Sequence, residues 1–422
     1  MPAPKDNELS APPPQSCILI YDPSSNPGGG LSRATELAAE LNQFNYIFLT
    51  HTPLTEIYHG KLPAKWENIC IQNALTPLKE HALFTTLENN TSSKIILKLC
   101  LIGFNILSTI NKAFILTKSL WALNNRKIDL IHSNCGIHYL PYQLSKLKNT
   151  ALVYAFRQMQ YSNPQNIKIN QKANMNVFVG DELKNYLMKI YNLSPQRCIT
   201  NHSPFAAIAR RNDEVCGDLA PILKAKKEGM KVIICLSRVV HEKGQHVVLE
   251  AFKELLKTHP KCILIIAGKA PKTIRHQEYL AQLNHTAKRS DIEDKVLFLG
   301  HRNDALSLLT LADISVQASL LFEPLAGVLV ESMQLGILTI SSDSGGAKEV
   351  IIPGETGHLY DKGDSRQLCS LLQHSLDNPE ESAMLAAQGQ KYATEKWAVE
   401  AITMKMASIY QQAIDEHSNN RR

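Results

Sequence analysis

The sequence predicts an α/β protein made of two Rossmann-like domains that face each other across a ligand-binding cleft. Short apolar runs bounded by turn residues alternate with helical patterns, and they do so in two separate series. Alternation of this kind indicates parallel sheets covered by helices on both faces. The 422 residues are enough for two domains of about 200 residues each. Because such folds bind ligands beyond the carboxyl ends of their strands, we expect the site there.

The first domain is expected at residues 16–205, after a flexible proline-containing tail at 1–15. It opens with a strand, a loop ending in three glycines, a helix and a second strand, which together form a βαβ unit. The strand candidates lie at 17–21, 46–49, 68–71, 130–132, 151–155 and 176–179.

The second domain is expected at residues 231–395, and residues 206–230 are expected to connect the two domains. The connection carries mixed charges and prolines and has little strand signal. The second series of short buried strands lies at 232–236, 262–266, 296–299, 314–316 and 338–340.

Composition excludes several classes of protein. Hydrophobic residues make up 44% and charged residues 20% of the chain, which excludes a disordered or fibrous protein. The net charge of +6 is accompanied by no nucleic-acid-binding signature. Nine cysteines are scattered singly, which argues against a zinc cluster and against a disulfide framework. The start of the sequence has no apolar signal region, so we expect a cytoplasmic protein.

Two acids, Glu323 and Glu331, are separated by seven residues in a segment that has a helical pattern. Pro324 suits the first turn of a helix, and Gly336 suits its end. If both acids were helical, they would lie about 12 Å apart on roughly one side, which suits an extended polar ligand. The alternative is an ordinary amphipathic helix with solvated glutamates.

Basic residues and glycines follow the first strand of each domain. Arg238 and Lys243 follow the strand at 232–236, and together they could neutralise phosphate charge. Gly29 and Gly30 precede the first helix, where backbone amides can approach an anion closely, although plain turn chemistry remains possible. Position 33 is arginine, which weakens a dinucleotide-binding interpretation of this loop.

The segment from Glu323 to Gly336 resembles the donor site of retaining glycosyltransferases of family 4 type, also called glycosyl transferases group 1, which have the GT-B fold. The resemblance continues through Ser344-Gly-Gly346 and Pro353-Gly-Glu-Thr-Gly357, and includes Arg238 with Glu242-Lys243-Gly244. It implies that the last helix, expected at 396–416, crosses back to the first domain.

The resemblance also implies roles for single residues in the donor site. Glu323 would contact the donor sugar and Glu331 the ribose, while Arg238 and Lys243 would neutralise the leaving diphosphate. The remaining positions implied to bind the donor are Gly29, Gly30, His301, Ala326 and Gly327. The chain departs from the family at Leu325-Ala326, where Phe-Gly is usual, and this places donor preference in question.

In the first domain, the resemblance places His132 and Arg157 at the floor of the cleft. Arg157 could bind an anionic acceptor or the diphosphate, or it could form a structural salt bridge. His132 could instead be a satisfied core residue. No D-x-D pair occurs, so we expect a metal-independent reaction in which basic residues and helix amides do the work of the metal.

The implied activity is transfer of a hexosyl group from a UDP- or GDP-sugar to a saccharide acceptor, with retention of anomeric configuration. The acceptor would be lipid-linked or part of a lipopolysaccharide or other surface glycan, and the nucleotide sugar is a co-substrate with no further cofactor. Two alternatives stay open: a nucleotide-sugar epimerase of the same fold, and a catalytically silent, membrane-associated binding protein.

A basic and apolar stretch at residues 94–123 suits two interpretations. Lys94, Lys98 and Lys112 would form one polar stripe on a helix that is otherwise apolar. The longest uncharged run is 13 residues, short of the roughly 20 needed to span a bilayer. The stretch could attach to an anionic membrane surface, at the inner face of the cytoplasmic membrane, or it could simply pack on the first domain.

Overall fold

The structure is a computed structural model that describes residues 15–23, 29–56, 62–71, 94–159, 169, 172–205 and 219–420. Residues 1–14 of the expected tail at 1–15, and residues 206–218 of the expected connection, lie outside these ranges. By internal contacts the chain divides into two units. Unit 1 comprises Met1–Val177, Tyr191–Ile199 and Thr403–Arg422, and unit 2 comprises Phe178–Ile190 and Thr200–Ile402. Each unit is described by itself.

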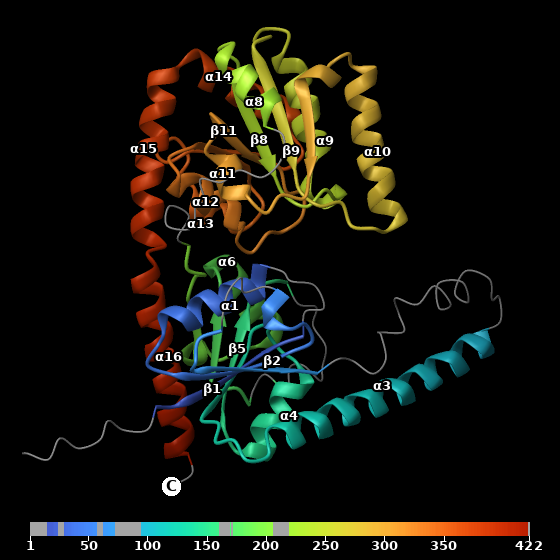
Figure 1. Ribbon diagram of the computed structural model, residues 1–422, viewed down its shortest axis with the longest axis vertical. Helices are drawn as coiled ribbons and strands as arrows, with labels where there is room; N and C mark the ends of the chain where they lie inside the picture. Colours follow the sequence, from blue (N-terminus) through green and yellow to red (C-terminus); the bar gives the residue numbers. More distant parts are fainter. Residues whose placement is uncertain are drawn as a thin grey trace, which may run out of the picture. The chain divides into compact units, whose positions relative to one another are not determined.

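The sheet associated with unit 1 has seven strands in the order β3-β2-β1-β4-β5-β6-β7. Its strands β1, β2 and β5 are labelled in Figure 1. The strands from β3 to β5 in this order pair in parallel. The strand bounds are Cys17–Asp22 for β1, Asn45–Thr50 for β2, Trp66–Cys70 for β3, Leu130–Ser133 for β4, Ala151–Phe156 for β5, Met175–Phe178 for β6 and Cys198–Thr200 for β7.

The helices along this part of the chain lie between the strands, and the C-terminal helix joins them. Their bounds are Gly29–Glu40 for α1, Leu54–Glu56 for the 3-10 turn η1, Lys94–Ala122 for α3, Tyr139–Lys148 for α4, Asp181–Tyr191 for α6, Pro195–Arg197 for η3 and Val399–Asn419 for α16. From α16, Met406, Ile409 and Tyr410 are buried in one cluster with strands β1, β2, β4 and β5 and helix α1. The last helix therefore completes the core of unit 1.

Unit 2 contains a six-stranded sheet in the order β10-β9-β8-β11-β12-β13, in which every neighbouring pair is parallel. The strand bounds are Lys231–Leu236 for β8, Cys262–Ala267 for β9, Val296–Gly300 for β10, Ile314–Gln317 for β11, Leu338–Ser342 for β12 and His358–Tyr360 for β13.

Helices follow most strands of unit 2. Their bounds are Ala220–Lys227 for α8, His241–Lys243 for the 3-10 turn η4, Gln245–Leu255 for α9, Ile274–Arg289 for α10, Glu293–Lys295 for the 3-10 turn η5, Ala305–Leu309 for α11, Gly327–Gln334 for α12, Ala347–Val350 for α13, Ser365–Asp377 for α14 and Pro379–Lys396 for α15.

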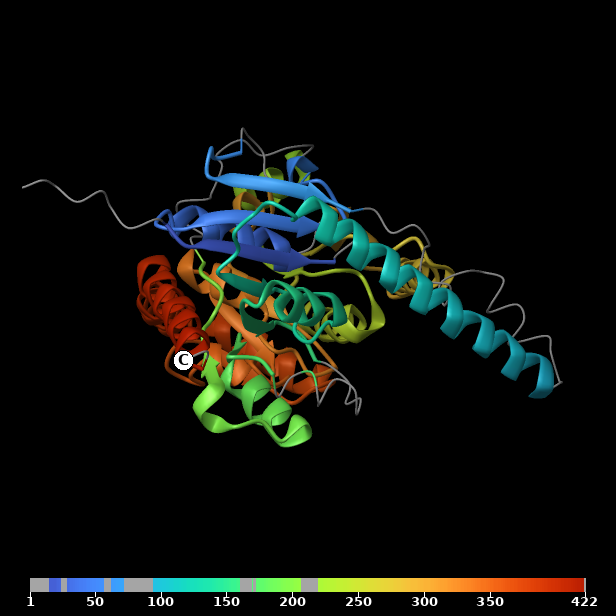
Figure 2. The same ribbon diagram turned by 90° about the horizontal axis from the view of Figure 1, so that it is seen from below.

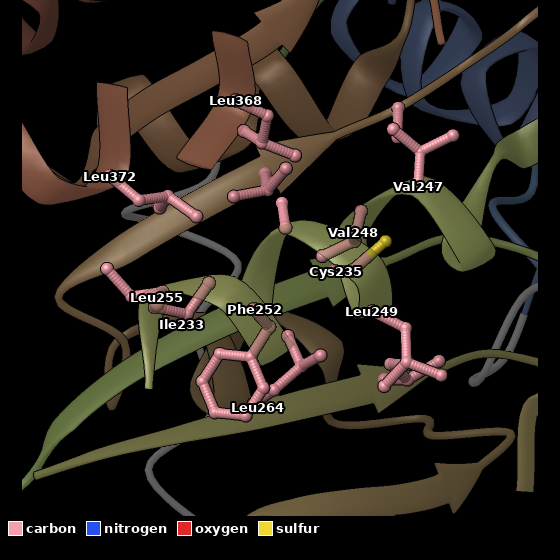
Figure 3. Packing of buried hydrophobic residues seen from close by; sticks show 14 of the residues in the cluster. Ile233, Cys235, Val247, Val248, Leu249, Phe252, Leu255, Leu264, Leu368 and Leu372 are labelled. Atoms are coloured by element: carbon pink, nitrogen blue, oxygen red, sulfur yellow. The ribbon is translucent and has the colours of Figure 1, made fainter. Parts of the chain in front are cut away.

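Alternate residues of the central strands in unit 2 pack on opposite faces of the sheet, as strand geometry requires. Ile233 and Leu264 point into a cluster with Phe252 of α9 and Leu368 of α14 (Figure 3). Their chain neighbours, Val232 and Ile263 among them, belong to a second cluster with residues of α8 and α11. Both faces of the sheet are therefore covered, which explains why these strands are continuous apolar runs in the sequence.

The predicted fold class is confirmed: the chain is α/β, with two Rossmann-like halves. Most predicted strands agree with observed ones within two residues, for example 262–266 with β9. The two edge strands β7 and β13 were not predicted, because each has only three residues and neither is a purely apolar run.

Candidate functional site

The most compact polar cluster at the carboxyl ends of the unit 2 strands is formed by Lys243, Ser319 and Glu323. Lys243 lies in η4 beyond the end of β8, and the other two follow the neighbouring strand β11. Lys243 Nζ donates to Glu323 Oε2, and Ser319 Oγ donates to the same oxygen at 3.3 Å. The side chains of Lys243 and Glu323 are 15% and 25% exposed, so the ion pair is reachable from solvent. A ligand can therefore compete for either partner.

The backbone of Glu323 is fixed by a segment far along the chain. Its N–H donates to the carbonyl of Ser344 at 2.7 Å, and its own carbonyl accepts from the N–H of Gly346 at 2.9 Å. Glu323 and Gly345 thus form an isolated parallel bridge. A Cβ at position 346 would lie 2.0 Å from the carbonyl oxygen of Pro324, so only glycine fits there. The two glycines therefore position Glu323.

The expected helix start at Pro324 is wrong. Helix α12 begins at Gly327 with Ala326 as its N-cap, and Glu323 lies before it in the bridge. Because that bridge uses both backbone groups of Glu323, this residue cannot also belong to the helix. Only Glu331 lies in α12, where it is partly buried. The two acids therefore do not lie on one helix, and the 12 Å estimate does not apply.

The loop that carries Lys243 is held closely against β11. Gly244 has φ of 66°, and a Cβ there would lie 2.0 Å from the carbonyl oxygen of Ala318. The N–H of Leu320 donates to the carbonyl of Glu242 at 2.9 Å. This close approach between neighbouring strand ends brings Lys243 and Glu323 together.

Sequence reasoning missed two residues that support this loop. Gln245 is fully buried, and its Nε2 donates to Ser237 Oγ at 2.9 Å and to the carbonyl of Arg238 at 2.8 Å. Tyr279, from α10, accepts the backbone N–H of His246 at 3.1 Å, and its hydroxyl lies 2.8 Å from His246 Nδ1. No sequence motif indicates the contacts of Gln245 or Tyr279, because both residues occupy positions that any helix of this pattern could have.

Arg238 and His301 lie on loops beyond β8 and β10, and both are exposed. Among the described residues, no hydrogen bond or ion pair joins the side chain of either to Lys243 or Glu323. The loop of His301 is stabilised by a buried ion pair in which Arg302 Nη2 lies 2.6 Å from Asp304 Oδ2. The structure therefore brings Lys243 and Glu323 into contact and leaves Arg238 and His301 free of that cluster.

In unit 1, Gly29 and Gly30 are the first two residues of α1, which follows β1. His132 is buried in β4, and its Nδ1 lies 2.9 Å from the hydroxyl of Tyr410 on α16. Burial, and secondly the charge of Arg157, lower the pKa of His132 to about 3, so its ring is neutral near pH 7. These features match the alternative of a core histidine.

Arg157, which is partly exposed, ends a chain of hydrogen bonds to two buried residues that the sequence did not indicate. Its Nε donates to Asn134 Oδ1 at 2.7 Å, and Asn134 Nδ2 donates to Asp22 Oδ2 at 2.6 Å. Burial lowers the pKa of Arg157, and the charge of Asp22 opposes that shift. The three residues come at or just after the ends of β5, β4 and β1. The guanidinium thus takes part in an internal network, but the partner in this hydrogen bond is a neutral amide, so the salt bridge of the structural alternative stays a prediction.

In the parts of the chain that the structure describes, no group of three or more His, Cys, Asp or Glu residues is arranged to hold a metal ion. The expectation of a metal-independent reaction stays a prediction, because it concerns chemistry that this geometry does not test.

Residues 223–392 match the family described as Glycosyl transferases group 1. A GDP-mannose-dependent monoacylated alpha-(1-6)-phosphatidylinositol monomannoside mannosyltransferase from Corynebacterium glutamicum is 30% identical over 188 residues, which cover 43% of this chain and 47% of that one. The lipopolysaccharide core biosynthesis mannosyltransferase LpsB from Rhizobium meliloti is 24% identical over 43% of this chain and 51% of its own. The matches thus span about half the length of these relatives.

Solved structures extend the likeness to both halves of the chain. The Anabaena protein Alr3699/HepE, in complex with UDP, covers 93% of this chain and 98% of its own with a TM-score of 0.71 and 18% identity. At this identity the likeness shows the fold alone. The fold is the GT-B type, with two Rossmann-like halves.

Proposed function

Because residues 223–392 form a glycosyl transferases group 1 domain, we propose that the protein transfers a hexosyl group from a nucleotide sugar to a saccharide acceptor. The observation that carries this proposal is the partly exposed cluster of Lys243, Ser319 and Glu323 at the carboxyl ends of adjacent strands. That is the edge at which parallel α/β sheets bind ligands.

In the proposed reaction, Lys243 exchanges its partner when the donor binds. The diphosphate takes the ammonium group from Glu323, and the freed carboxylate accepts hydrogen bonds from the hydroxyls of the donor sugar. Exposed Arg238 adds a second cation as the nucleoside diphosphate leaves. The bridge to Gly345 fixes the backbone of Glu323, so its side chain extends from a defined position when the donor binds.

The remaining donor contacts are proposed from the resemblance to the family. Backbone amides at Ala326 and Gly327, where α12 begins, favour a phosphate oxygen, and Glu331 would accept from the ribose. The loop of His301 would offer backbone groups to the base. Gly29 and Gly30, at the start of α1, offer the same kind of anion-binding amides in unit 1.

We propose that transfer retains anomeric configuration and needs no metal. The acceptor hydroxyl attacks on the face from which the diphosphate leaves, and a phosphate oxygen takes its proton, so no side-chain base is required. Positive charge from Lys243 and Arg238 then does the work that a metal ion does elsewhere. Unchanged turnover in excess EDTA, and a product with the anomeric configuration of the donor, would support both points.

The acceptor is proposed to be a lipid-linked or surface glycan. This rests on the relatives, whose names describe a phosphatidylinositol mannoside and a lipopolysaccharide core as their products or substrates. The donor base stays open between uridine and guanosine, since one relative is named as GDP-mannose-dependent and Alr3699/HepE was solved with UDP. We also propose that the protein acts in the cytoplasm, where it would meet the nucleotide-sugar donor.

The test uses the full-length protein with a panel of UDP- and GDP-hexoses. We expect at least one of them to raise the melting temperature and to be hydrolysed slowly in the absence of acceptor. Formation of an epimer would favour the epimerase alternative, and binding without turnover would favour the silent binding protein. If no nucleotide sugar binds, the proposal is wrong.

A further inference from the structure

Helix α3 spans Lys94–Ala122, 29 residues, and side-chain positions are described from Leu107 onward. Its C-terminal half rests on α4: Ser119 is fully buried, and Lys112 Nζ lies 5.8 Å from the centre of the Tyr139 ring. Figures 1 and 2 both show the rest of the helix extending away from α4 and from the sheet of unit 1. The side chains of residues 94–106 are outside the described set, and the surface considered for docking lies on the C-terminal half.

Four large apolar side chains of this half are exposed: Leu107 by 41%, Ile110 by 56%, Phe114 by 40% and Trp121 by 82%. At about 100° per residue they fall within an arc of roughly 60°, about 150° around the helix from Ser119. They therefore form an apolar stripe on the side turned away from α4. Single exposed apolar residues are ordinary, but four on one helix face indicate an interaction surface.

The charge of the segment that carries this apolar stripe has one sign. Residues 93–128 contain six lysines and arginines and no acidic residue. Lys118 lies beside the stripe, with its Nζ over the Phe114 ring at 4.7 Å from the ring centre, so a positive charge lies next to the exposed apolar side chains. A cation beside an apolar face, in a segment without acidic residues, complements anionic lipid headgroups.

A second copy of the chain is a weaker candidate for the occupant, because pairing α3 with α3 through the stripe would bury Lys118 of both copies without an acidic partner on the helix. A membrane-spanning arrangement of α3 is also not supported, because among the described residues no helix is long and apolar enough to cross a bilayer. The remaining arrangement is a helix that lies along the surface with Trp121 at headgroup depth, where indole rings are favoured.

We propose that α3 docks on an anionic lipid bilayer through the apolar stripe of Leu107, Ile110, Phe114 and Trp121. The inference is independent of the proposed glycosyl transfer, since it uses no residue of the donor site.

The test is co-flotation of the full-length protein with vesicles of phosphatidylcholine mixed with phosphatidylglycerol. We expect binding to these vesicles, weaker binding to phosphatidylcholine alone, and partial release by salt. The double variant Ile110→Asp/Phe114→Asp should bind about tenfold less or weaker still, since two large apolar side chains lose their burial. The matched control is Ile274→Asp, on α10 of unit 2, whose side chain is 78% exposed; it should bind as wild type does.

Tryptophan fluorescence provides an independent measurement. Trp397 is fully buried and Trp66 is partly buried, so a blue shift on adding vesicles should come from Trp121 and should disappear in Trp121→Phe. Unchanged melting temperatures would show that the variants fold. The proposal is overturned if the wild type does not bind vesicles or if the double variant binds them equally well. It is also overturned if the wild type is a dimer that does not bind vesicles and the double variant is a monomer, because the stripe would then be a dimer interface.

Discussion

Both sheets end in charged side chains at the carboxyl ends of their strands, but the two sets of charges differ in burial. In unit 2, Lys243 and Glu323 pair with each other and remain partly exposed. In unit 1, Asp22 and Asn134 are almost fully buried and form a chain of hydrogen bonds with Arg157, which is itself partly exposed, so the difference lies in the burial of the acid. A pair that water can reach can exchange partners with a ligand at low cost, whereas a buried network holds the fold together.

The comparison predicts the largest effect on stability for Arg157→Met. The variant leaves Asp22 and Asn134 buried without their cationic partner, so we expect a loss of about 3–5 kcal/mol in the free energy of unfolding. The matched control is Arg238→Met, because Arg238 is exposed, and it should change stability by no more than about 0.5 kcal/mol. Urea unfolding followed by circular dichroism measures both. Equal losses would remove the distinction between the two networks.

The opposite pattern is expected for Lys243→Met in unit 2. Activity with the nucleotide sugar identified by screening should fall by about 10²–10³-fold, because the cation that neutralises the leaving group is lost. The melting temperature should change little, since the pair is partly exposed. The control is Lys231→Met. Lys231 is the first residue of β8, at the end of the strand opposite to the Lys243 loop, and its Nζ lies 3.3 Å from Asp313 Oδ1. This substitution should not affect turnover. Near-normal activity of Lys243→Met would contradict the site assignment.

Buried His132 should make stability depend on pH. Its pKa is lowered to about 3 in the folded state, so below its usual unfolded value of about 6.5 protons bind preferentially to the unfolded chain. The contribution of His132 to the free energy of unfolding is thus fully present above pH 6.5. It falls by about 1.4 kcal/mol per pH unit between roughly pH 6.5 and pH 3.

The measurement is the urea midpoint between pH 7 and pH 4.5 for wild type and His132→Asn. The variant should show a shallower decline, even if it is less stable throughout. His301, which is exposed, provides the control, and His301→Asn should keep the slope of the wild type. Identical slopes in wild type and His132→Asn would show that the histidine is not kept neutral by burial.

The sequence predicted features that depend on neighbours along the chain. Strands such as β8 and β9 are continuous apolar runs, and the motif around Lys243 placed it correctly beyond the end of β8. The start of α12 was predicted wrongly because Pro324 suits a first turn locally, while the bridge that excludes Glu323 from the helix comes from residues 344–346. Local patterns do not carry that information.

Contacts between distant segments account for the residues that were missed. Tyr410 reaches His132 from 278 positions further along the chain, and Asp22 is joined to Asn134 across 112 positions. Neither belongs to a recognisable motif. Burial, which decides whether a charge serves a ligand or the fold, also depends on the whole unit, so the sequence left both alternatives open for Arg157.

The smallest expected effect comes from Tyr279→Phe. This variant tests whether a residue of α10, which does not belong to the site, helps to position the Lys243 loop. The hydroxyl accepts the N–H of His246, one of the amides that α9 leaves unpaired at its start. Loss of this hydrogen bond should lower the free energy of unfolding by about 1 kcal/mol and increase the mobility of the loop that carries Lys243. Because that loop meets the donor diphosphate in the proposed reaction, the KM for the nucleotide sugar should rise a few-fold while kcat changes less.

The control for this variant is Tyr392→Phe, because the Tyr392 hydroxyl contacts Lys396 and not the Lys243 loop. A similar loss of stability in both variants, with a raised KM only in Tyr279→Phe, would show that Tyr279 acts on the loop. If KM stays at the wild-type value in Tyr279→Phe, the loop is held by Gln245 and Gly244 alone, and the carboxyl edge of unit 2 needs no support from α10.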